Sequence, residues 1–433
     1  MPDPRVFIYD EFTPEDTAML QALYSRSAAS VEEHVDKVKA SGSGKFMETY
    51  YVGYSHKSIG DCGTTTLFFE GVSELAAKAI QDWQLYNGQQ TSTRYIDFAR
   101  QPVTDPLNTV ASAAILEEWM RFYRESLKPV TEHLKIQFPI KEGEKEALYE
   151  KAVKARTFDI LRSFLPAGVT TQLSWHTNLR QARDKLSWLR HHPLEELRDL
   201  AARVTQALKK QYPNSFKYRL HGSQEAYRAE CAAQYTYFNP LDPPEFAFST
   251  DIVPEEADHY STLLKNRPIK TELPPFLDEL GMVRFEYLLD YGSFRDVQRH
   301  RHGVCRMPLL TSEHDFEPWY LEQLPSERRH RARELLDKQS EAVAALNTSA
   351  TIRQYYLAMG YRVACRTTYP LPAAVYTAEL RSSSTVHPTL RKIARRMCDA
   401  MASAFPRLTL HCDHRGDTFD IRRGKQDIII KTD

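Results

Sequence analysis

The 433-residue chain lacks several features that would place it in a common class of protein. Lysine plus arginine equals aspartate plus glutamate at 57 each, so no charge excess favours a nucleic-acid polymer as partner. No run of 18 apolar residues is present, so we expect no membrane-spanning helix and no membrane partner. The first residues have no apolar core of a signal peptide. We therefore expect a cytoplasmic protein, and the length predicts two or three domains.

Cysteine is scarce, and its spacing indicates no disulfide framework. The six cysteines include no Cys-x-x-Cys pair, so we expect reduced thiols, as in the cytosol. Two segments combine histidine and cysteine, one with His300, His302 and Cys305, the other running from His411 to His414. The first does not have the spacing of a closed zinc site, and the second lies near the C-terminus, so we predict no metal at either.

The motifs that mark common nucleotide and nucleophile sites are also missing. No Gly-x-Gly-x-x-Gly fingerprint is present, so a Rossmann nucleotide site is not supported. The segment Gly42-Ser-Gly44-Lys45 lacks the earlier glycine of a phosphate-binding loop. No Gly-x-Ser-x-Gly elbow provides a serine nucleophile. Any anionic ligand must therefore be held by another arrangement.

Hydrophobic periodicity predicts mostly helices with a few strands. Apolar residues three or four apart predict helices over 73–81, 111–134, 142–165 and 327–346. Residues 64–70, rich in β-branched and aromatic side chains, and residues 427–431 are typical of strands. We predict an α+β fold.

A weak internal repeat divides the chain into two related halves. Residues 175–181 resemble residues 376–382, an offset of 201 positions, and each copy follows an Arg-x-x-x-Pro segment, Arg162 to Pro166 and Arg366 to Pro370. Prolines within residues 238–246 interrupt regular structure. We predict halves at 1–235 and 236–433, each with helices packed on a small mixed or antiparallel sheet.

Two short segments combine the side chains that a phosphorylated ligand requires. The first is Arg299-His300-Arg301, and the second is Ser92-Thr-Arg94-Tyr95. Guanidinium groups match phosphate oxygens two at a time, and histidine adds a donor whose charge is tunable near neutral pH. The alternative for the first segment is a solvated basic surface, which is how we interpret the similar cluster at 328–333.

A third segment, His56-Lys-Ser58-Ile-Gly-Asp61, precedes the first predicted strand. Its histidine, hydroxyl and carboxylate could line a cofactor site. The alternative is a turn that caps the strand, since serine, glycine and aspartate favour turns.

The order of these segments resembles the flavin-dependent thymidylate synthases. The resemblance covers His56-x-Ser58-x-x-Asp61, Ser92-x-Arg94-Tyr95, Arg162-x-x-x-Pro166 and Trp175-x-Thr-Asn178-x-Arg180 followed by Leu189-Arg190. The family hallmark is Arg-His-Arg followed after seven residues by Ser and then Arg-Tyr. Here the hallmark is divided between the halves. The first half carries Asp82-Trp-Gln84 in place of Arg-His-Arg, and the second half has no Ser-x-Arg-Tyr after Arg301.

The resemblance implies an enzyme that binds FAD and makes dTMP from dUMP. Methylenetetrahydrofolate supplies the one-carbon unit and NADPH reduces the flavin. Family members are homotetramers that share active sites between subunits, so a chain with two halves would form a homodimer.

The resemblance also assigns roles to individual residues. It implies catalytic roles for Arg299 and Arg94. Cofactor-binding roles fall on His56, Ser58, Asn178, His300 and Arg301. Substrate-binding roles fall on Gln90, Ser92, Arg94, Arg162, Arg190 and Arg299. Gln90 stands where the family has a glutamate.

Two alternatives stay open because the hallmark is divided. The first is a related flavin enzyme that methylates or hydroxymethylates another pyrimidine nucleotide. The second is a scaffold that binds a nucleotide or a partner without catalysis, since fold does not guarantee function.

Overall fold

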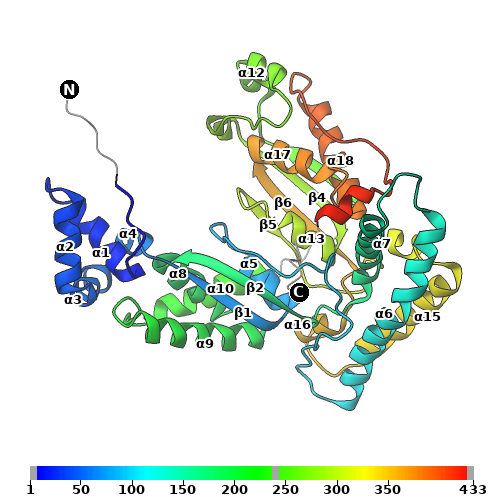
Figure 1. Cartoon of the computed structure of the whole chain (residues 1–433), viewed down its shortest axis with the longest axis horizontal. Coiled ribbons are helices and arrows are strands. Elements are labelled where there is room, and N and C mark those ends of the chain that lie inside the picture. The colour runs from blue at the N-terminus through cyan, green and yellow to red at the C-terminus, as the bar shows by residue number, and fades with distance from the viewer. Residues whose placement is uncertain (1–6, 237–242, 427–433) are drawn as a thin grey trace. The chain divides into compact units, whose positions relative to one another are not determined.

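The computed structural model describes residues 7–236 and 243–426, which form two compact units of helices and small sheets (Figure 1). Unit 1 comprises Met1–Phe69, Leu85–Gln90 and Gln172–Thr236. Unit 2 comprises Glu70–Gln84, Thr91–Thr171 and Tyr237–Asp433. The α+β prediction is confirmed. Within the described ranges, no helix is long and apolar enough to cross a bilayer.

Unit 1 contains helices around a two-stranded sheet formed by β1 (Thr64–Ser73) and β2 (Thr170–Asn178). The last residues of β1 and the first residues of β2 belong to unit 2. The remaining elements of unit 1 are α1 (Pro14–Tyr24), α2 (Val31–Ser41), α3 (Gly44–Phe46), the π-helix η1 (Met47–Gly53), α4 (Lys57–Asp61), α8 (Leu179–Leu189), α9 (Glu195–Gln211) and α10 (Gly222–Thr236). A small core forms between α1 and α2, where Met19 and Leu20 contact Val35 and Val38. The segment at residues 56–61, for which a turn was the alternative, is the short helix α4, and Asp61 pairs with Arg180 at 2.6 Å.

Unit 2 contains an antiparallel sheet of four strands in the order β3-β4-β6-β5. The strands are β3 (Phe246–Thr250), β4 (Met282–Asp290), β5 (Val304–Arg306) and β6 (Arg362–Pro370). Alternate residues of β4, such as Val283, Phe285 and Tyr287, are buried, as expected for a strand with one face in a core. The helices α17 (Leu371–Ser382) and α18 (Pro388–Ala404) lie along this sheet (Figure 1).

The other helices of unit 2 confirm most of the predicted ones. Helix α5 (Glu74–Gln81), α6 (Val110–Gln137), α7 (Glu146–Leu161) and α15 (Ser326–Ala344) lie where periodicity placed helices. Thr109 and Ser112 form a capping box that fixes the start of α6. The shorter elements are η2 (Arg162–Phe164), α11 (Pro254–Asp258), α12 (Ser261–Asn266), η3 (Pro275–Leu280), α13 (Tyr291–Val297), α14 (Pro318–Glu322), α16 (Ala350–Arg353), η4 (Gln354–Tyr356) and η5 (Ile421–Gln426).

Two segments of the chain repeat the same order of elements, but the predicted register is wrong. The elements η2, β2 and α8 begin at 162, 170 and 179, and η4, β6 and α17 begin at 354, 362 and 371, an offset of 192 rather than 201. Asn178 precedes α8 as its N-cap, and Pro370 occupies that place before α17. Glu379, which the sequence comparison paired with Asn178, lies inside α17. A shared Leu-Arg pair, at different places in the two helices, caused the error.

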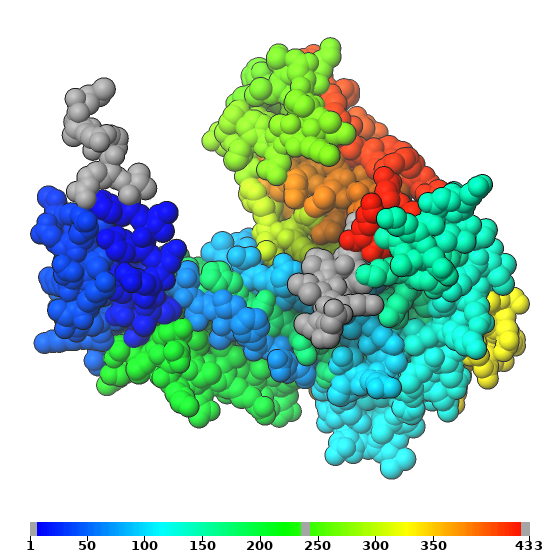
Figure 2. Space-filling view, in the orientation of Figure 1, coloured from blue at the N-terminus to red at the C-terminus, as the bar shows by residue number. Residues whose placement is uncertain are grey.

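The C-terminal strap, which we define as Asp413–Gln426, lies against α7. Phe419 stacks on Phe138 with ring centroids 5.2 Å apart. A side chain at Gly424 would meet the carbonyl oxygen of Leu148 at 2.4 Å, so only glycine allows this close approach. Figure 2 shows the red strap beside the blue-green residues of α7. The predicted strand at 427–431 lies outside the described residues.

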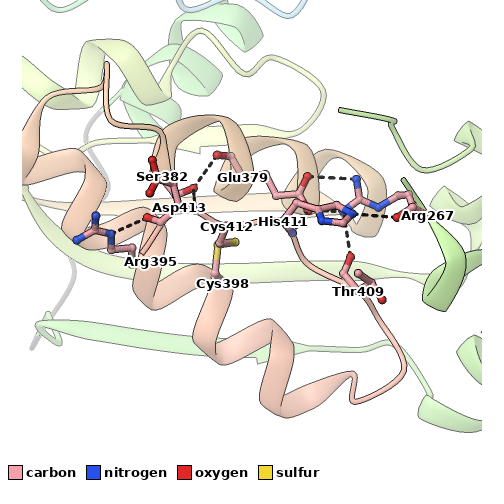
Figure 3. The surroundings of a disulfide bond; sticks show 9 residues. All are labelled: Arg267, Glu379, Ser382, Arg395, Cys398, Thr409, His411, Cys412 and Asp413. Atoms are coloured by element: carbon pink, nitrogen blue, oxygen red, sulfur yellow. Dashed lines mark hydrogen bonds and ion pairs between the residues drawn. A yellow bond between two sulfur atoms is a disulfide. The ribbon is translucent and has the colours of Figure 1, made fainter. Parts of the chain in front are cut away.

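A disulfide joins Cys398 of α18 to Cys412 (Figure 3). The expectation that all cysteines are reduced is therefore wrong for this pair. Next to it, Asp413 accepts a hydrogen bond from Arg395, and His411 contacts the carbonyl oxygen of Arg267 at 2.9 Å. The disulfide and these contacts fix the chain where it leaves α18 and enters the strap.

Candidate functional site

The predicted site residues separate into two groups, one in each unit. Unit 2 holds Ser92, Arg94, Arg162, Arg299, His300 and Arg301. Unit 1 holds His56, Ser58, Gln90, Asn178 and Arg190. The structure tests where these side chains lie, and their roles stay predictions.

In unit 2, Arg94 forms a two-point ion pair with a buried carboxylate. The loop before it is shaped by Ser92, whose hydroxyl accepts a hydrogen bond from the Arg94 amide. The guanidinium of Arg94 donates from Nε to Asp159 Oδ1 at 2.7 Å and from Nη2 to Oδ2 at 3.3 Å. Asp159 lies on α7 and is fully buried. On the strap, Arg423 forms a second ion pair with the same carboxylate.

The charge of Asp159 is fixed by these two arginines. Burial alone would raise the pKa of the carboxyl, because a charged group loses its hydration. Arg423 and Arg94 outweigh burial and hold the pKa of Asp159 well below its usual value. Asp159 therefore carries a full negative charge at neutral pH.

Arg162, three residues after Asp159, is buried inside a network of hydroxyl groups. Its Nη2 donates to Ser293 Oγ at 2.8 Å, and that hydroxyl lies 2.8 Å from Thr389 Oγ1. His387 lies 2.9 Å from the same Thr389 hydroxyl, and burial followed by Arg162 lowers the pKa of His387 well below its usual value. Arg162, which we predicted to bind the nucleotide, is therefore only 2% exposed.

The Arg299-His300-Arg301 segment follows α13, whose start is capped by Asp290. Asp296 lies 3.6 Å from the Nε of Arg299. Burial would raise the pKa of Asp296, but Arg299 and Arg381 outweigh it and lower the pKa, with smaller contributions from Arg162 and Arg94. The two motifs, about two hundred positions apart in sequence, thus act on one carboxylate.

We call this group the arginine cluster. Its members are Arg94, Arg162, Arg299, Arg381, Arg423, Asp159, Asp290 and Asp296. Five guanidinium groups face three carboxylates, so the cluster has a surplus of positive charge. Arg299, with half of its side chain exposed, can meet a ligand from solvent. Such a surplus suits a small anion such as a phosphate.

His300 differs from the sequence-based expectation. Its Nε2 accepts a hydrogen bond from Arg381 Nε at 2.7 Å, which requires a neutral ring. Burial and, after it, Arg381 lower the pKa of His300 to about 3. The expectation of a charge tunable near neutral pH is therefore wrong for His300, which can donate only from Nδ1.

In unit 1, Arg190 is engaged by a carboxylate. Its guanidinium donates to both oxygens of Glu225, at 3.0 Å each from Nη2. His191 and Arg228 contact the same carboxylate at 2.9 Å and 2.7 Å. These three groups lower the pKa of Glu225, although burial acts in the opposite direction.

The Arg190–Glu225 pair lies at the wall of a cavity of about 500 Å³. Six cationic side chains line it against two carboxylates. They are Lys57, Arg183, Arg190, Lys217, Arg219 and Arg228, with Asp184 and Glu225 as the anions. The cavity, like the arginine cluster, suits an anionic ligand.

The remaining predicted residues of unit 1 have local structural contacts. The Oδ1 of Asn178 accepts from the Gln181 amide as an N-cap, which leaves its amide nitrogen for other contacts. Ser58 is an exposed residue of α4, and Gln90 forms an isolated bridge with Leu173. His56 has a buried Nδ1 with no hydrogen-bond partner among residues 7–236 and 243–426.

Sequence reasoning missed Asp159, Asp296, Arg381 and Arg423. Asp159 and Asp296 could have been identified from the sequence, because each lies three positions before a predicted site arginine. That is the spacing of neighbouring side chains on a helix. In the described part of the chain, no three His, Cys, Asp or Glu side chains are grouped to hold a metal.

These features define an α+β protein with a repeated order of elements and two groups of cationic side chains whose charge suits a small anion. Residues 10–214 match the family described as thymidylate synthase complementing protein. Over that segment the chain is similar to this family, the flavin-dependent thymidylate synthases, and the resemblance seen in the motifs is confirmed there.

Curated relatives match over more of the chain. A UPF0159 protein of Thermoplasma acidophilum is 24% identical over 470 aligned positions, covering 91% of this chain and 94% of the relative. UPF0159 proteins of Chlamydia pneumoniae and Chlamydia muridarum are 25% and 22% identical, and cover 81% and 82% of this chain and 76% and 77% of the relatives. The similarity extends well beyond the segment that matches the family.

Proposed function

We propose that this protein is an FAD-dependent thymidylate synthase that methylates dUMP to dTMP with methylenetetrahydrofolate and reduced nicotinamide. The family match at residues 10–214 carries this proposal. The arginine cluster supports it, because residues of both motif segments act on one carboxylate, Asp296. We further propose a cytoplasmic homodimer.

The donor set fits an anionic flavin cofactor. In unit 2, Arg301 is partly exposed and follows His300 directly. In unit 1, the buried Nδ1 of His56 has no hydrogen-bond partner within the described ranges. We propose that His56, Ser58 and Asn178 of unit 1 and His300 and Arg301 of unit 2 contact FAD. When bound, the flavin supplies the hydride that converts the transferred one-carbon unit into a methyl group.

The chain's own residues would act by charge and position. We propose that Arg94 and Arg299, together with Ser92, bind the nucleotide phosphate and polarise the pyrimidine, since both lie in a cluster with more guanidinium groups than carboxylates. His300 is neutral and contributes as a hydrogen-bond donor rather than a general acid. Gln90, Arg162 and Arg190 are proposed to help position the nucleotide.

Two experiments test the proposal. The visible spectrum of the purified protein should show bound flavin, and a colourless protein that does not bind added FAD would contradict it. Expression in a thymidine-requiring bacterium should restore growth. A flavoprotein that fails to restore growth would favour the related pyrimidine-nucleotide (hydroxy)methylase, a reading supported by Asp82-Trp-Gln84 in place of the first Arg-His-Arg and by Gln90.

Light scattering on the protein as it elutes from a size-exclusion column tests the homodimer. A chain of 50.0 kDa should elute with about twice that mass. A monomer at working concentration would exclude the dimer.

A further inference from the structure

The C-terminal strap brings a charged side chain into the arginine cluster. Arg423, on η5, forms its ion pair with Asp159, the same carboxylate that holds Arg94. Its guanidinium carbon also lies 5.8 Å from the ring centroid of Tyr95, the residue after Arg94. Only 13% of the Arg423 side chain is exposed. The strap thus contacts the carboxylate that pairs with Arg94 and the sequence motif that contains Arg94.

The position of Arg423 is fixed by packing on both sides along the strap. Before it, Asp417 accepts from Arg156 of α7 at 2.8 Å, and Phe419 stacks on Phe138. After it, Gly424 touches α7 at Leu148. Because these contacts hold the backbone, Arg423 reaches Asp159 from a set direction rather than from a loose tail.

The shared carboxylate determines how much charge Arg94 can offer a ligand. With Arg94 alone, Asp159 would form a one-to-one pair that cancels most of the arginine charge. With Arg423 on the other side, one negative charge serves two guanidinium groups, so a net positive charge remains beside Arg94. A net charge in a low-dielectric surrounding acts strongly on an approaching anion.

We propose that Arg423 is a positioning residue of the nucleotide site, which leaves Arg94 with the charge needed to bind the phosphate of the nucleotide. This inference rests on the proposed function for the identity of the nucleotide. It assigns a role to a segment outside residues 10–214, which carry the family match.

The test is calorimetric titration of the full-length protein with dUMP, inorganic phosphate and deoxyuridine. Arg423→Gln should weaken the binding of dUMP and of phosphate at least about tenfold, because it removes one charge close to the anion. Deoxyuridine affinity should stay within about twofold, since it has no phosphate. A merely structural role would weaken nucleotide and nucleoside alike.

The strap offers a matched control one residue away. Arg422 carries the same charge, but 72% of its side chain is exposed and it pairs with Asp420. Arg422→Gln should leave all three affinities unchanged, and Arg423→Lys should restore most of the phosphate affinity. The melting temperatures of the Gln and Lys variants report whether each one folds.

Each other outcome bears on the inference. Equal loss of dUMP and deoxyuridine in Arg423→Gln, or no loss of phosphate affinity, would overturn it. A wild-type protein that binds no phosphate-bearing probe would overturn it as well. If phosphate binds in an Arg423-dependent way and dUMP binds no better than phosphate, the proposed substrate is wrong and the role of Arg423 stands.

Discussion

Replacing Asp159 with asparagine should destabilise unit 2 more than any single surface change. The side chain of Asp159 is fully buried and is the shared counter-ion of Arg94 and Arg423, which are 15% and 13% exposed. Asparagine keeps the size and removes the charge, so two nearly buried guanidinium groups lose their counter-ion. Breaking a buried ion pair by removing one partner costs about 3–5 kcal/mol. We expect a loss of that size in the free energy of unfolding at pH 7.

The loss should depend on pH in a defined direction. The folded-state pKa of Asp159 is well below its usual value, which in the unfolded chain is about 3.9. The ionised carboxylate therefore contributes stability that is fully present above that unfolded value and is lost as the pH falls through the folded-state pKa. The difference between wild type and Asp159→Asn should be constant from pH 5 to pH 8 and shrink below about pH 4.

Urea unfolding measures this difference, and hydrogen exchange of the α7 amides locates it in unit 2. Asp420→Asn is the control, because Asp420 pairs with the exposed Arg422 and should contribute at most about 1 kcal/mol. A loss below about 1 kcal/mol for Asp159→Asn at pH 7, or an equal loss at pH 3, would refute the reasoning.

Three further predictions concern the site and the strap. Arg301→Ala should purify with less flavin absorbance, whereas Arg94→Ala should keep its colour and lose about 2–5 kcal/mol of dUMP binding; unaltered colour and affinity would count against both assignments. Reducing the Cys398–Cys412 disulfide, whose cysteines are 14 positions apart, should lower stability by about 3 kcal/mol; an unchanged melting temperature in reductant would contradict this. In an NMR titration, the His300 ring should stay neutral from pH 5 to pH 8; a midpoint near 6.5 would show that Arg381 is not its donor.

Local patterns in the sequence predicted the helices and the strand β1 well. The long helices α6 and α15 were predicted because their periodicity extends over many turns. The two arginine motifs were also found, because arginine, histidine and serine at short spacings are recognisable without knowledge of the fold. The register of the repeat failed, since a two-residue match can occur at two places in one helix.

The counter-charges could not be predicted from local patterns. Asp159 lies 65 positions after Arg94, and Arg423 comes from a segment with no periodicity of its own. The neutral state of His300 could not be predicted either. Burial and Arg381 lower its pKa, and both depend on how α17 packs in unit 2. Ion pairs of this kind are set by topology, which sequence spacing does not describe.

The reach of the strap back to α7 also constrains how the protein is made. A ribosome synthesises Asp159 264 positions before Arg423. At roughly 5–20 residues per second, the two are separated by roughly 13–50 s of synthesis. During that interval Asp159 lacks Arg423, one of the two arginines that pair with it in the complete protein. Unit 2 should therefore reach its final resistance to proteases only after the strap has emerged from the exit tunnel.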